Sequence, residues 1–229
     1  MESDQTERKR AVAERAAALV EQGMAVGLGT GSTAALLIEA LIRRVREEDL
    51  HFVAVPTSER TADQASAGGI LLTDLGAHPQ LDLAIDGADQ IAEGSLALIK
   101  GYGGALLREK IVAAAAKHFV VIADDSKLSP GLDKKVPVEV VRFGWQSTDR
   151  QIRALGAETE LRKAADGSPY LTDGGNYILD AALGPLPDPA ATNQALRAIV
   201  GVVETGLFIA MADTALLATA DGVVTLTRT

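Results

Sequence analysis

Carboxylates, lysines and hydroxyl groups recur in four short segments of the chain, each of which follows an apolar run. The segments are GTGST (residues 29–33), DGAD (86–89), KGYGG (100–104) and ADDSK (123–127). A carboxylate can act as a general base or relay protons between oxygens, and a lysine or backbone amides can hold the oxyanion that forms. These groups therefore indicate proton transfer beside a carbonyl of a small substrate.

The GTGST segment has the composition of an anion-binding loop. Glycines at positions 27, 29 and 31 lie between an apolar run and a helix-like segment, so backbone N–H groups can approach a ligand at a helix N-terminus. Hydroxyl groups come from three further residues, Thr30, Ser32 and Thr33. The spacing matches neither the P-loop, because no lysine follows the last glycine, nor GxGxxG, because the third glycine comes one residue early. The alternative to a phosphate site is a tight strand-to-helix turn with a Ser/Thr cap.

The acidic residues also have a plainer interpretation. Asp-Gly is a common turn dipeptide, so Asp86 and Asp89 indicate either a turn or a carboxylate pair at the mouth of a site. Glu109 lies between Arg108 and Lys110 in a segment with helical character. Taken alone, that pattern is typical of a solvated helical face, and the Ala- and Leu-rich surroundings do not place Glu109 inside or outside the fold.

Composition excludes several classes of function. The 229 residues include 22 basic and 31 acidic side chains, a formal charge of −9 that disfavours nonspecific nucleic-acid binding. The absence of cysteine excludes disulfides, thiolate metal sites and thiol nucleophiles, and the three histidines lack ligand spacing, so we expect no zinc site. No apolar run approaches the ~20 residues of a membrane span, and the N-terminal residues lack a signal-peptide pattern. The expected location is the cytoplasm.

Strands and helices alternate along the first part of the chain. Helices are predicted over residues 5–22, 34–48, 58–67 and 104–117, and strands over 24–28, 51–55, 70–73, 81–85 and 118–123. This alternation indicates an α/β fold, with a mostly parallel sheet and helices on both faces, as in Rossmann-like domains. Because open α/β sheets bind ligands beyond the carboxyl ends of their strands, the four polar segments are expected to outline one crevice.

The pattern changes near Pro130. Strands are predicted over residues 136–141, 157–162, 176–182 and 201–208, with helices over 147–156 and 189–200. The order βαββαβ is typical of a ferredoxin-like α+β module. The last segment, residues 215–227, reads as two strands around an Ala-Asp-Gly turn that rejoin the first sheet. The prediction is a catalytic domain of residues 1–129 and 208–229, with an inserted lid or interface domain of residues 130–207.

The ordered set of motifs closely resembles the type A ribose-5-phosphate isomerases. The matching segments run in family order over nearly the whole chain: VGLGTGST, PTSERT, DLAIDGADQI, KGYGGALLREKIV, VVIADDSKL, VPVEV, DGGNYILD and GVVETGLF. The resemblance implies an aldose–ketose isomerase of the non-oxidative pentose phosphate pathway. It would interconvert ribose 5-phosphate and ribulose 5-phosphate through an enediolate, without a metal or cofactor.

The resemblance also implies a set of site residues. The catalytic glutamate of the family falls on Glu109, which reverses the reading of that residue as a solvated one, and its aspartate pair falls on Asp86 and Asp89. Its loop lysine falls on Lys100, near the developing oxyanion. The implied substrate-binding residues are Lys9, Thr30, Gly31, Ser32, Thr33, Gly101, Gly103, Gly104 and Lys127.

Two residues depart from the family pattern. Tyr102 stands in a loop where similar proteins often read KGGGGAL, and Gln90 stands where DGADEI is usual. The Tyr102 side chain could narrow the pocket, contact substrate or point to solvent. Family resemblance further implies a homodimer or homotetramer acting on a small sugar phosphate, with no nucleic acid and no membrane as partner.

Three other functions fit parts of the pattern. A sugar-phosphate sensor could use a related fold, but no helix-turn-helix segment precedes the domain and the charge is acidic. A transferase could use Glu109 as a covalent nucleophile. A dinucleotide dehydrogenase is disfavoured by the glycine spacing.

Overall fold

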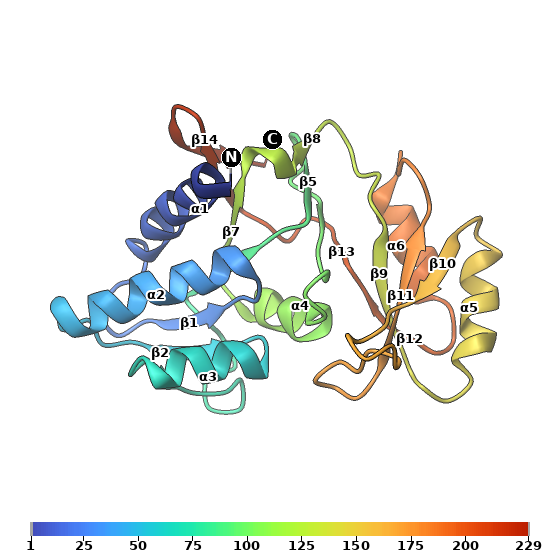
Figure 1. Cartoon of the computed structure of the whole chain (residues 1–229), viewed down its shortest axis with the longest axis horizontal. Coiled ribbons are helices and arrows are strands. Elements are labelled where there is room, and N and C mark those ends of the chain that lie inside the picture. The colour runs from blue at the N-terminus through green and yellow to red at the C-terminus, as the bar shows by residue number, and fades with distance from the viewer. Residues whose placement is uncertain (1, 229) are drawn as a thin grey trace.

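The computed structural model describes residues 2–228, with side chains from residue 5 onward, and contains two main sheets that lie side by side (Figure 1). The larger sheet has seven strands in the order β15-β14-β7-β4-β1-β2-β3. Its strands are β1 (Ala25–Leu28), β2 (Val53–Pro56), β3 (Leu71–Leu72), β4 (Leu83–Gly87), β7 (Phe119–Asp124), β14 (Thr214–Thr219) and β15 (Gly222–Thr227). All neighbouring strands are parallel except the β14–β15 hairpin.

Helices cover both faces of this sheet, as the α/β prediction requires. The apolar side chains of β4 alternate between the faces: Leu83 and Ile85 pack with residues of α1 and α2, whereas Ala84 packs with Val112 of α4. This alternation follows from the two-residue period of a strand. The helices are α1 (Glu2–Ala17), α2 (Ser32–Glu47), α3 (Glu59–Ala67) and α4 (Leu106–Ala115). None of the helices in residues 2–228 is long and apolar enough to cross a membrane.

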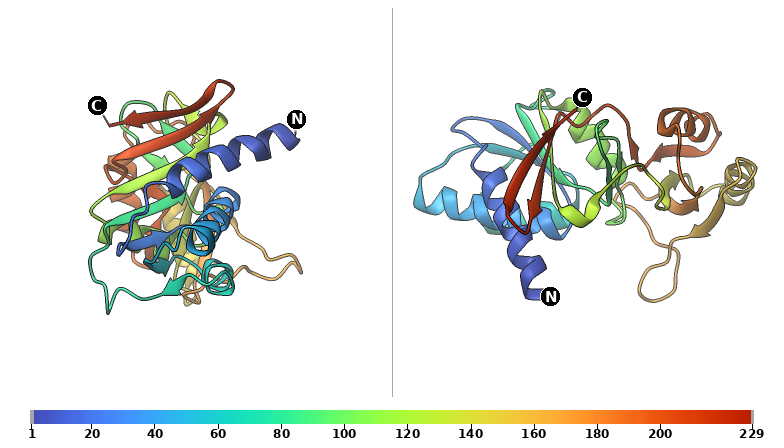
Figure 2. Two further views of the ribbon diagram at one scale, coloured as in Figure 1. Left: turned by 90° about the vertical axis from the view of Figure 1, so that its left-hand side faces the viewer. Right: turned by 90° about the horizontal axis from the view of Figure 1, so that it is seen from above.

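The second sheet has four antiparallel strands in the order β10-β11-β9-β12. Its elements are β9 (Val136–Val140), α5 (Trp145–Arg153), β10 (Glu158–Leu161), β11 (Tyr177–Ala182), α6 (Pro189–Arg197) and β12 (Val202–Thr205). The chain order βαββαβ and this strand order are those of a ferredoxin-like module. The right view of Figure 2 shows the module beside the larger sheet, and both views show a long loop after β10 extending from the module.

A third, small sheet that the sequence analysis did not predict connects the two. It has the order β13-β6-β5-β8 and consists of β5 (Gln90–Ala92), β6 (Leu98–Ile99), β8 (Leu128–Ser129) and β13 (Leu207–Phe208). A short 3₁₀ turn, η1 (Asp125–Lys127), precedes β8. The strand β6 ends directly before Lys100, so the small sheet fixes where that residue enters the site.

Two predicted elements end differently in the structure. The first helix ends at Ala17 rather than near Gly23, and residues 18–24 form turns. The strand predicted over 201–208 is interrupted at Gly206, so β12 belongs to the module and β13 to the small sheet. The reason is local: the Gly206 N–H donates to Pro137 O at 2.7 Å and its carbonyl accepts from Lys100 N at 2.8 Å. The chain therefore passes from one sheet to the other at this residue.

Candidate active site

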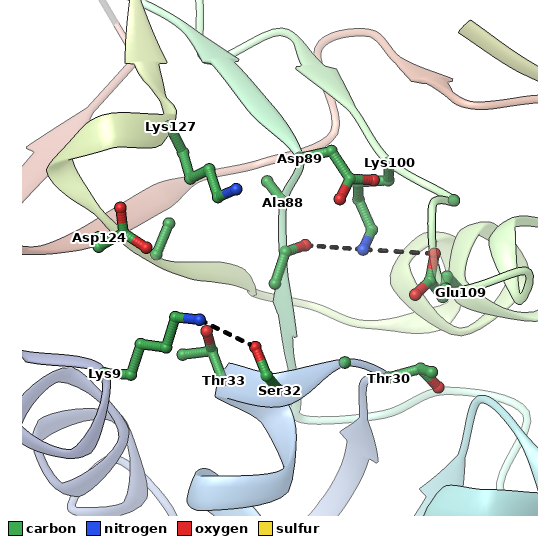
Figure 3. A pocket seen from close by; sticks show the side chains of 15 residues that line it. Lys9, Thr30, Ser32, Thr33, Ala88, Asp89, Lys100, Glu109, Asp124 and Lys127 are labelled. Atoms are coloured by element: carbon green, nitrogen blue, oxygen red, sulfur yellow. Dashed lines mark hydrogen bonds and ion pairs between the residues drawn. The ribbon is translucent and has the colours of Figure 1, made fainter. Parts of the chain in front are cut away.

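A polar pocket lies at the carboxyl ends of β1, β4 and β7, where parallel α/β sheets bind ligands (Figure 3). Its lining comes from the four segments that the sequence singled out, from α1 and from α4. The lining residues are Lys9, Thr30, Gly31, Ser32, Thr33, Gly87, Ala88, Asp89, Lys100, Gly101, Gly103, Glu109, Ala123, Asp124 and Lys127.

Three buried charged groups form one end of the pocket. The Lys100 ammonium lies 2.9 Å from Asp86 Oδ2 and 3.4 Å from Glu109 Oε2, and it donates a hydrogen bond to Gly87 O at 2.7 Å. All three side chains are at most 5% exposed. Within the described part of the chain, those two carboxylate oxygens accept no hydrogen bond of ordinary geometry. Both oxygens are fully buried, so their ion pairs with Lys100 are what offsets the cost of burying their charge.

Burial and charge shift the acid–base behaviour of this cluster. Burial, together with the charge of Asp86, raises the pKa of Glu109 from 4.5 to about 8, although Lys100 opposes the shift. Burial also raises the pKa of Asp86, again against the attraction of Lys100. Burial alone would lower the pKa of Lys100, but the charges of Asp86 and Glu109 outweigh it and raise that pKa. The lysine is therefore held as a cation next to a carboxyl group that can exchange a proton near neutral pH.

The Asp86 carboxylate is fixed by the glycine loop after β1. Its Oδ1 atom accepts from Thr30 N at 3.0 Å and from Gly87 N at 2.7 Å. Gly29 is required here because a Cβ at that position would overlap the Asp86 carboxylate and would lie 2.6 Å from its Cα. The loop predicted to bind phosphate therefore also positions an aspartate.

The Thr30 side chain joins a buried group of hydroxyls. Its Oγ1 atom donates to Ser58 Oγ at 2.8 Å and lies 2.8 Å from Thr57 Oγ1 and 3.2 Å from Thr61 Oγ1. Ser58 is the N-cap of α3, because its side chain accepts from Thr61 N. The Thr30 hydroxyl is thus engaged within the fold, and its backbone N–H serves Asp86.

The opposite end of the pocket is cationic and rich in donors. The ammonium groups of Lys9 and Lys127 both extend toward the pocket in Figure 3, and Lys9 Nζ donates to Ser32 Oγ at 3.1 Å. Ser32 and Thr33 begin α2, whose N-cap residue Gly31 gives no side-chain cap, so backbone donors at this end are open to an anion.

Asp124 lies between these lysines and was not among the site residues predicted from the sequence. It is buried at the end of β7, and its side chain accepts from Ser126. Burial alone would raise the pKa of Asp124, but the Ser126 hydrogen bonds and the charges of Lys127 and Lys9 lower it. Its place in the polar ADDSK segment at a strand end was the signal that could have identified it.

Most of the residues predicted for the site come together, with some exceptions. Asp86 lies under the pocket and contacts it through Lys100, whereas Gly104 lines a separate hollow and faces Tyr170, with which an added Cβ would overlap. Tyr102 does not line the pocket: its hydroxyl donates to Lys135 O at 3.1 Å, toward the module. Tyr102 is 46% exposed, so its side chain fits the third possibility, pointing to solvent, and its contact with the module was not foreseen.

Within the described residues, no group of three or more histidine or acidic side chains is arranged to hold a metal ion. The buried carboxylates of Asp86 and Glu109 pair instead with Lys100.

Comparison with known proteins gives a consistent result. The family model described as ribose 5-phosphate isomerase A (phosphoriboisomerase A) matches residues 53–222. A ribose-5-phosphate isomerase A from Synechococcus sp. (strain JA-3-3Ab) is 55% identical over 96% of this chain and 96% of its own length. The same-named protein of Gloeobacter violaceus is 53% identical over 96% and 95%.

Solved structures agree. The ribose 5-phosphate isomerase A of Methanocaldococcus jannaschii superposes with a TM-score of 0.93 at 40% identity, covering 97% of this chain and 99% of the other. A D-ribose-5-phosphate isomerase in complex with phospho-erythronic acid gives a TM-score of 0.93 at 36% identity, covering 97% and 98%. The chain belongs to the ribose 5-phosphate isomerase A family, whose members interconvert ribose 5-phosphate and ribulose 5-phosphate.

Proposed function

We propose that this chain carries out the family reaction in the pocket between Lys9 and Glu109, with Glu109 as the base that moves a proton between C1 and C2 of the sugar. The observation that carries the proposal is the contact of Lys100 with both Asp86 and Glu109 at the end of a pocket whose other end is cationic. This arrangement offers a base and an oxyanion partner at one end and an anion site at the other.

The environment of Glu109 supports its role as the base. A general base works best when its pKa lies near the pH of the reaction, and burial raises the pKa of Glu109 to about 8. Its position in the first turn of α4 leaves the carboxylate at the pocket wall. In the forward direction it would take the proton from C2 of the aldose and return it to C1, with the enediolate between the two transfers.

Lys100 and the two aspartates have complementary roles in this proposal. The Lys100 ammonium would stabilise the oxyanion of the enediolate, since it is charged, buried and fixed by Gly87 O. Asp86 and Asp89 would open the sugar ring and pass protons between its oxygens. Asp86→Asn is then expected to slow turnover of the closed-ring sugar more than turnover of an open-chain substrate, and equal losses would argue against ring opening by Asp86.

The cationic end of the pocket would bind the phosphate. Lys9, Lys127 and the first residues of α2 supply charge and N–H donors there. The phospho-erythronic acid in a solved relative is a phosphorylated sugar acid, and we propose that it competes with ribose 5-phosphate for this pocket.

The domain division and the assembly state are further parts of the proposal. We propose that residues 130–207 form an inserted module and that residues 1–129 and 208–229 form the catalytic domain. We also propose that the chain works in the cytoplasm as a homodimer or homotetramer. Two module residues support burial against another copy, since Phe143 is 95% and Val200 is 86% exposed. Light scattering of the purified protein measures the mass directly.

The decisive experiment is a turnover assay with purified protein, ribose 5-phosphate and EDTA. We expect isomerisation without added metal, and we expect Glu109→Gln to lower kcat at least ~100-fold while leaving substrate binding largely intact. Glu39→Gln is the matched control, because Glu39 is a helical glutamate whose nearest ion-pair partner, Arg10, lies on the protein surface. It should retain the rate of the unaltered chain.

The other outcomes separate the alternative functions. Binding of ribose 5-phosphate without turnover would favour the sensor interpretation. A covalent adduct on Glu109, detected by mass spectrometry after incubation with substrate, would favour the transferase interpretation. A near-normal kcat in Glu109→Gln would remove Glu109 from the role of base.

A further inference from the structure

The glycine loop around Lys100 is held from the side of the module by one arginine. Arg162 follows the end of β10, and its Nη1 atom donates to Gly101 O at 2.7 Å and to Tyr102 O at 3.3 Å. Gly101 is the residue next to Lys100, and both line the pocket. The arginine therefore contacts the backbone one residue away from the buried ammonium.

The guanidinium group of Arg162 is itself fixed. Its Nε atom donates to Asp180 Oδ2 at 2.9 Å and its Nη2 atom donates to Asp180 Oδ1. Asp180 lies on β11, opposite β10 in the antiparallel sheet. The side chains are only 14% and 19% exposed, and a two-point contact between a planar guanidinium and a carboxylate sets the direction of the remaining donors.

Besides Arg162, the Gly101 carbonyl accepts one hydrogen bond from within the loop, from Gly104 N at 3.0 Å. Gly101 and Gly104 have φ values of +105° and +83°, a region that glycine enters freely. On the side of the larger sheet, Tyr102 N donates to Asp89 Oδ2 at 3.0 Å. On the side of the module, the loop is held by Arg162 and by the Tyr102 hydroxyl on Lys135 O. Hydrogen bonds therefore hold the loop from two sides, from Asp89 and from the module.

We propose that Arg162, oriented by Asp180, is a positioning residue for the isomerisation: it holds the carbonyls of Gly101 and Tyr102 so that Lys100 and Asp89 keep their places at the pocket. This inference rests on the function proposed for Lys100. It also gives the module a part in the chemistry, because a residue that directly follows one of its strands determines the conformation of a loop in the active site.

The test is the kinetics of Arg162→Ala with chemical rescue. A displacement of about 1 Å in a reacting group can lower a rate ~100-fold, so we expect kcat to fall about 10- to 100-fold while KM changes less than about 3-fold. Added guanidinium ion, at a concentration that does not unfold the protein, should restore part of the lost kcat. Arg162→Lys keeps the charge but not the planar fork, so its kcat should stay at least ~5-fold low.

A matched control exists in the same module. Arg153 also pairs with a carboxylate, at 2.8 Å from Asp149 Oδ2, and also donates to a backbone carbonyl, Thr159 O, at 2.7 Å, but it has no contact with the glycine loop. Arg153→Ala should keep the kcat of the unaltered chain, and guanidinium should not increase it. Because Arg153 is more exposed than Arg162, melting temperatures are measured for both variants.

The outcomes distinguish this inference from the proposed function. If the unaltered chain does not isomerise ribose 5-phosphate, the proposed function fails whatever Arg162 does. If it does, a kcat of Arg162→Ala within about 2-fold of the unaltered chain, or a loss that guanidinium does not restore, overturns the positioning role. Should Arg162→Ala fail to fold, Asp180→Asn decides: a folded Asp180→Asn variant with reduced kcat and little change in KM supports the role, and one with normal kcat overturns it.

Discussion

Asp86 and Glu109 share the ammonium of a single lysine, with Lys100 Nζ at 2.9 Å from one carboxylate and 3.4 Å from the other. Two buried carboxylates and one ammonium leave an excess negative charge if both acids are ionised. Such a charge is costly in a buried site, so one of the two carboxyl groups retains a proton to higher pH than usual. The pair is therefore able to store and release one proton beside the substrate.

The pH dependence of kcat/KM should show the coupling between Asp86 and Glu109. Glu109 must be deprotonated to act as a base, so activity should rise with pH up to about 8, the raised pKa of Glu109. Burial is the first cause of the raised pKa and the charge of Asp86 is the second. Asp86→Asn removes that second cause and leaves the attraction of Lys100, so the acidic limb should move to lower pH by about one unit.

The quantity to compare between variants is the pH at which the acidic limb of the kcat/KM profile lies, not the maximum value of kcat/KM. Asp82→Asn is a suitable control, because Asp82 precedes the other end of β4 and pairs with Lys117 at the surface. Its limb should coincide with that of the unaltered chain. An acidic limb that stays in place or moves to higher pH in Asp86→Asn would show that the two carboxylates are not coupled in this way.

The ionisation of Glu109 that favours activity at high pH should destabilise the folded protein. A carboxyl group whose pKa is raised by folding stabilises the native state below its ordinary pKa of 4.5 and loses that contribution as pH rises through about 8. Glutamine cannot ionise, so Glu109→Gln should be more stable than the unaltered chain at about pH 9 and should lose this advantage near about pH 4. With about 1.4 kcal/mol per pKa unit, the gain is on the order of a few kcal/mol. Urea unfolding at both pH values measures it, and an equal difference at the two would contradict the shifted pKa.

A separate prediction concerns substrate binding at the cationic end of the pocket, where we propose that the phosphate binds. Lys127→Met should raise KM for ribose 5-phosphate at least ~10-fold and affect kcat less, because the lysine meets a group that does not react. The dependence of KM on salt should weaken in the variant. Lys117→Met is the control, since Lys117 is 57% exposed at the opposite ends of the strands. A large loss of kcat with unchanged KM would place Lys127 at the reacting atoms instead.

The arrangement of the larger sheet and the location of the crevice could both be predicted from the sequence. Apolar runs such as residues 118–123 identify strands because a buried parallel strand is apolar throughout, and β7 occupies residues 119–124. Once the strands alternate with helices, topology places the ends of all parallel strands at one edge. The meeting of Asp89 and Lys127 around one pocket follows from that rule. Lys100 is instead placed by β6 of the small sheet, which the sequence analysis did not predict.

Other features depended on contacts between distant segments. The burial of Glu109 requires Lys100 and Asp86 beside α4, which no local pattern around Arg108 and Lys110 encodes. The small sheet has strands of two or three residues, too short for a periodic signal. Gly104 was assigned to the substrate by position in its motif, but its left-handed φ and the closeness of Tyr170 give it a structural reason of its own.

Gln90, which like Tyr102 departs from the family pattern, has hydrogen bonds whose contribution to stability can be tested with a double mutant. Its Nε2 atom donates to Asp133 Oδ1 at 2.7 Å and to Ser129 Oγ at 3.0 Å, and its Oε1 atom accepts from Asp133 N and Lys134 N at 3.0 Å. Glutamate would keep the acceptor but would replace the donor with a second carboxylate oxygen facing Asp133. We expect Gln90→Glu to lower the free energy of unfolding by about 1–3 kcal/mol at neutral pH.

Asp133→Asn should reverse much of that loss. The asparagine amide can donate to the new glutamate, so the double variant should be more stable than Gln90→Glu alone, with a coupling energy of about 1 kcal/mol or more. Because Lys134 Nζ donates to Asp89 O at 2.9 Å, the same loop connects Gln90 to the active site, and the kcat of Gln90→Glu should fall and recover together with its stability. Urea unfolding of the four variants gives the cycle, and additive effects of the two substitutions would show that the Gln90 amide and the Asp133 carboxylate do not depend on each other.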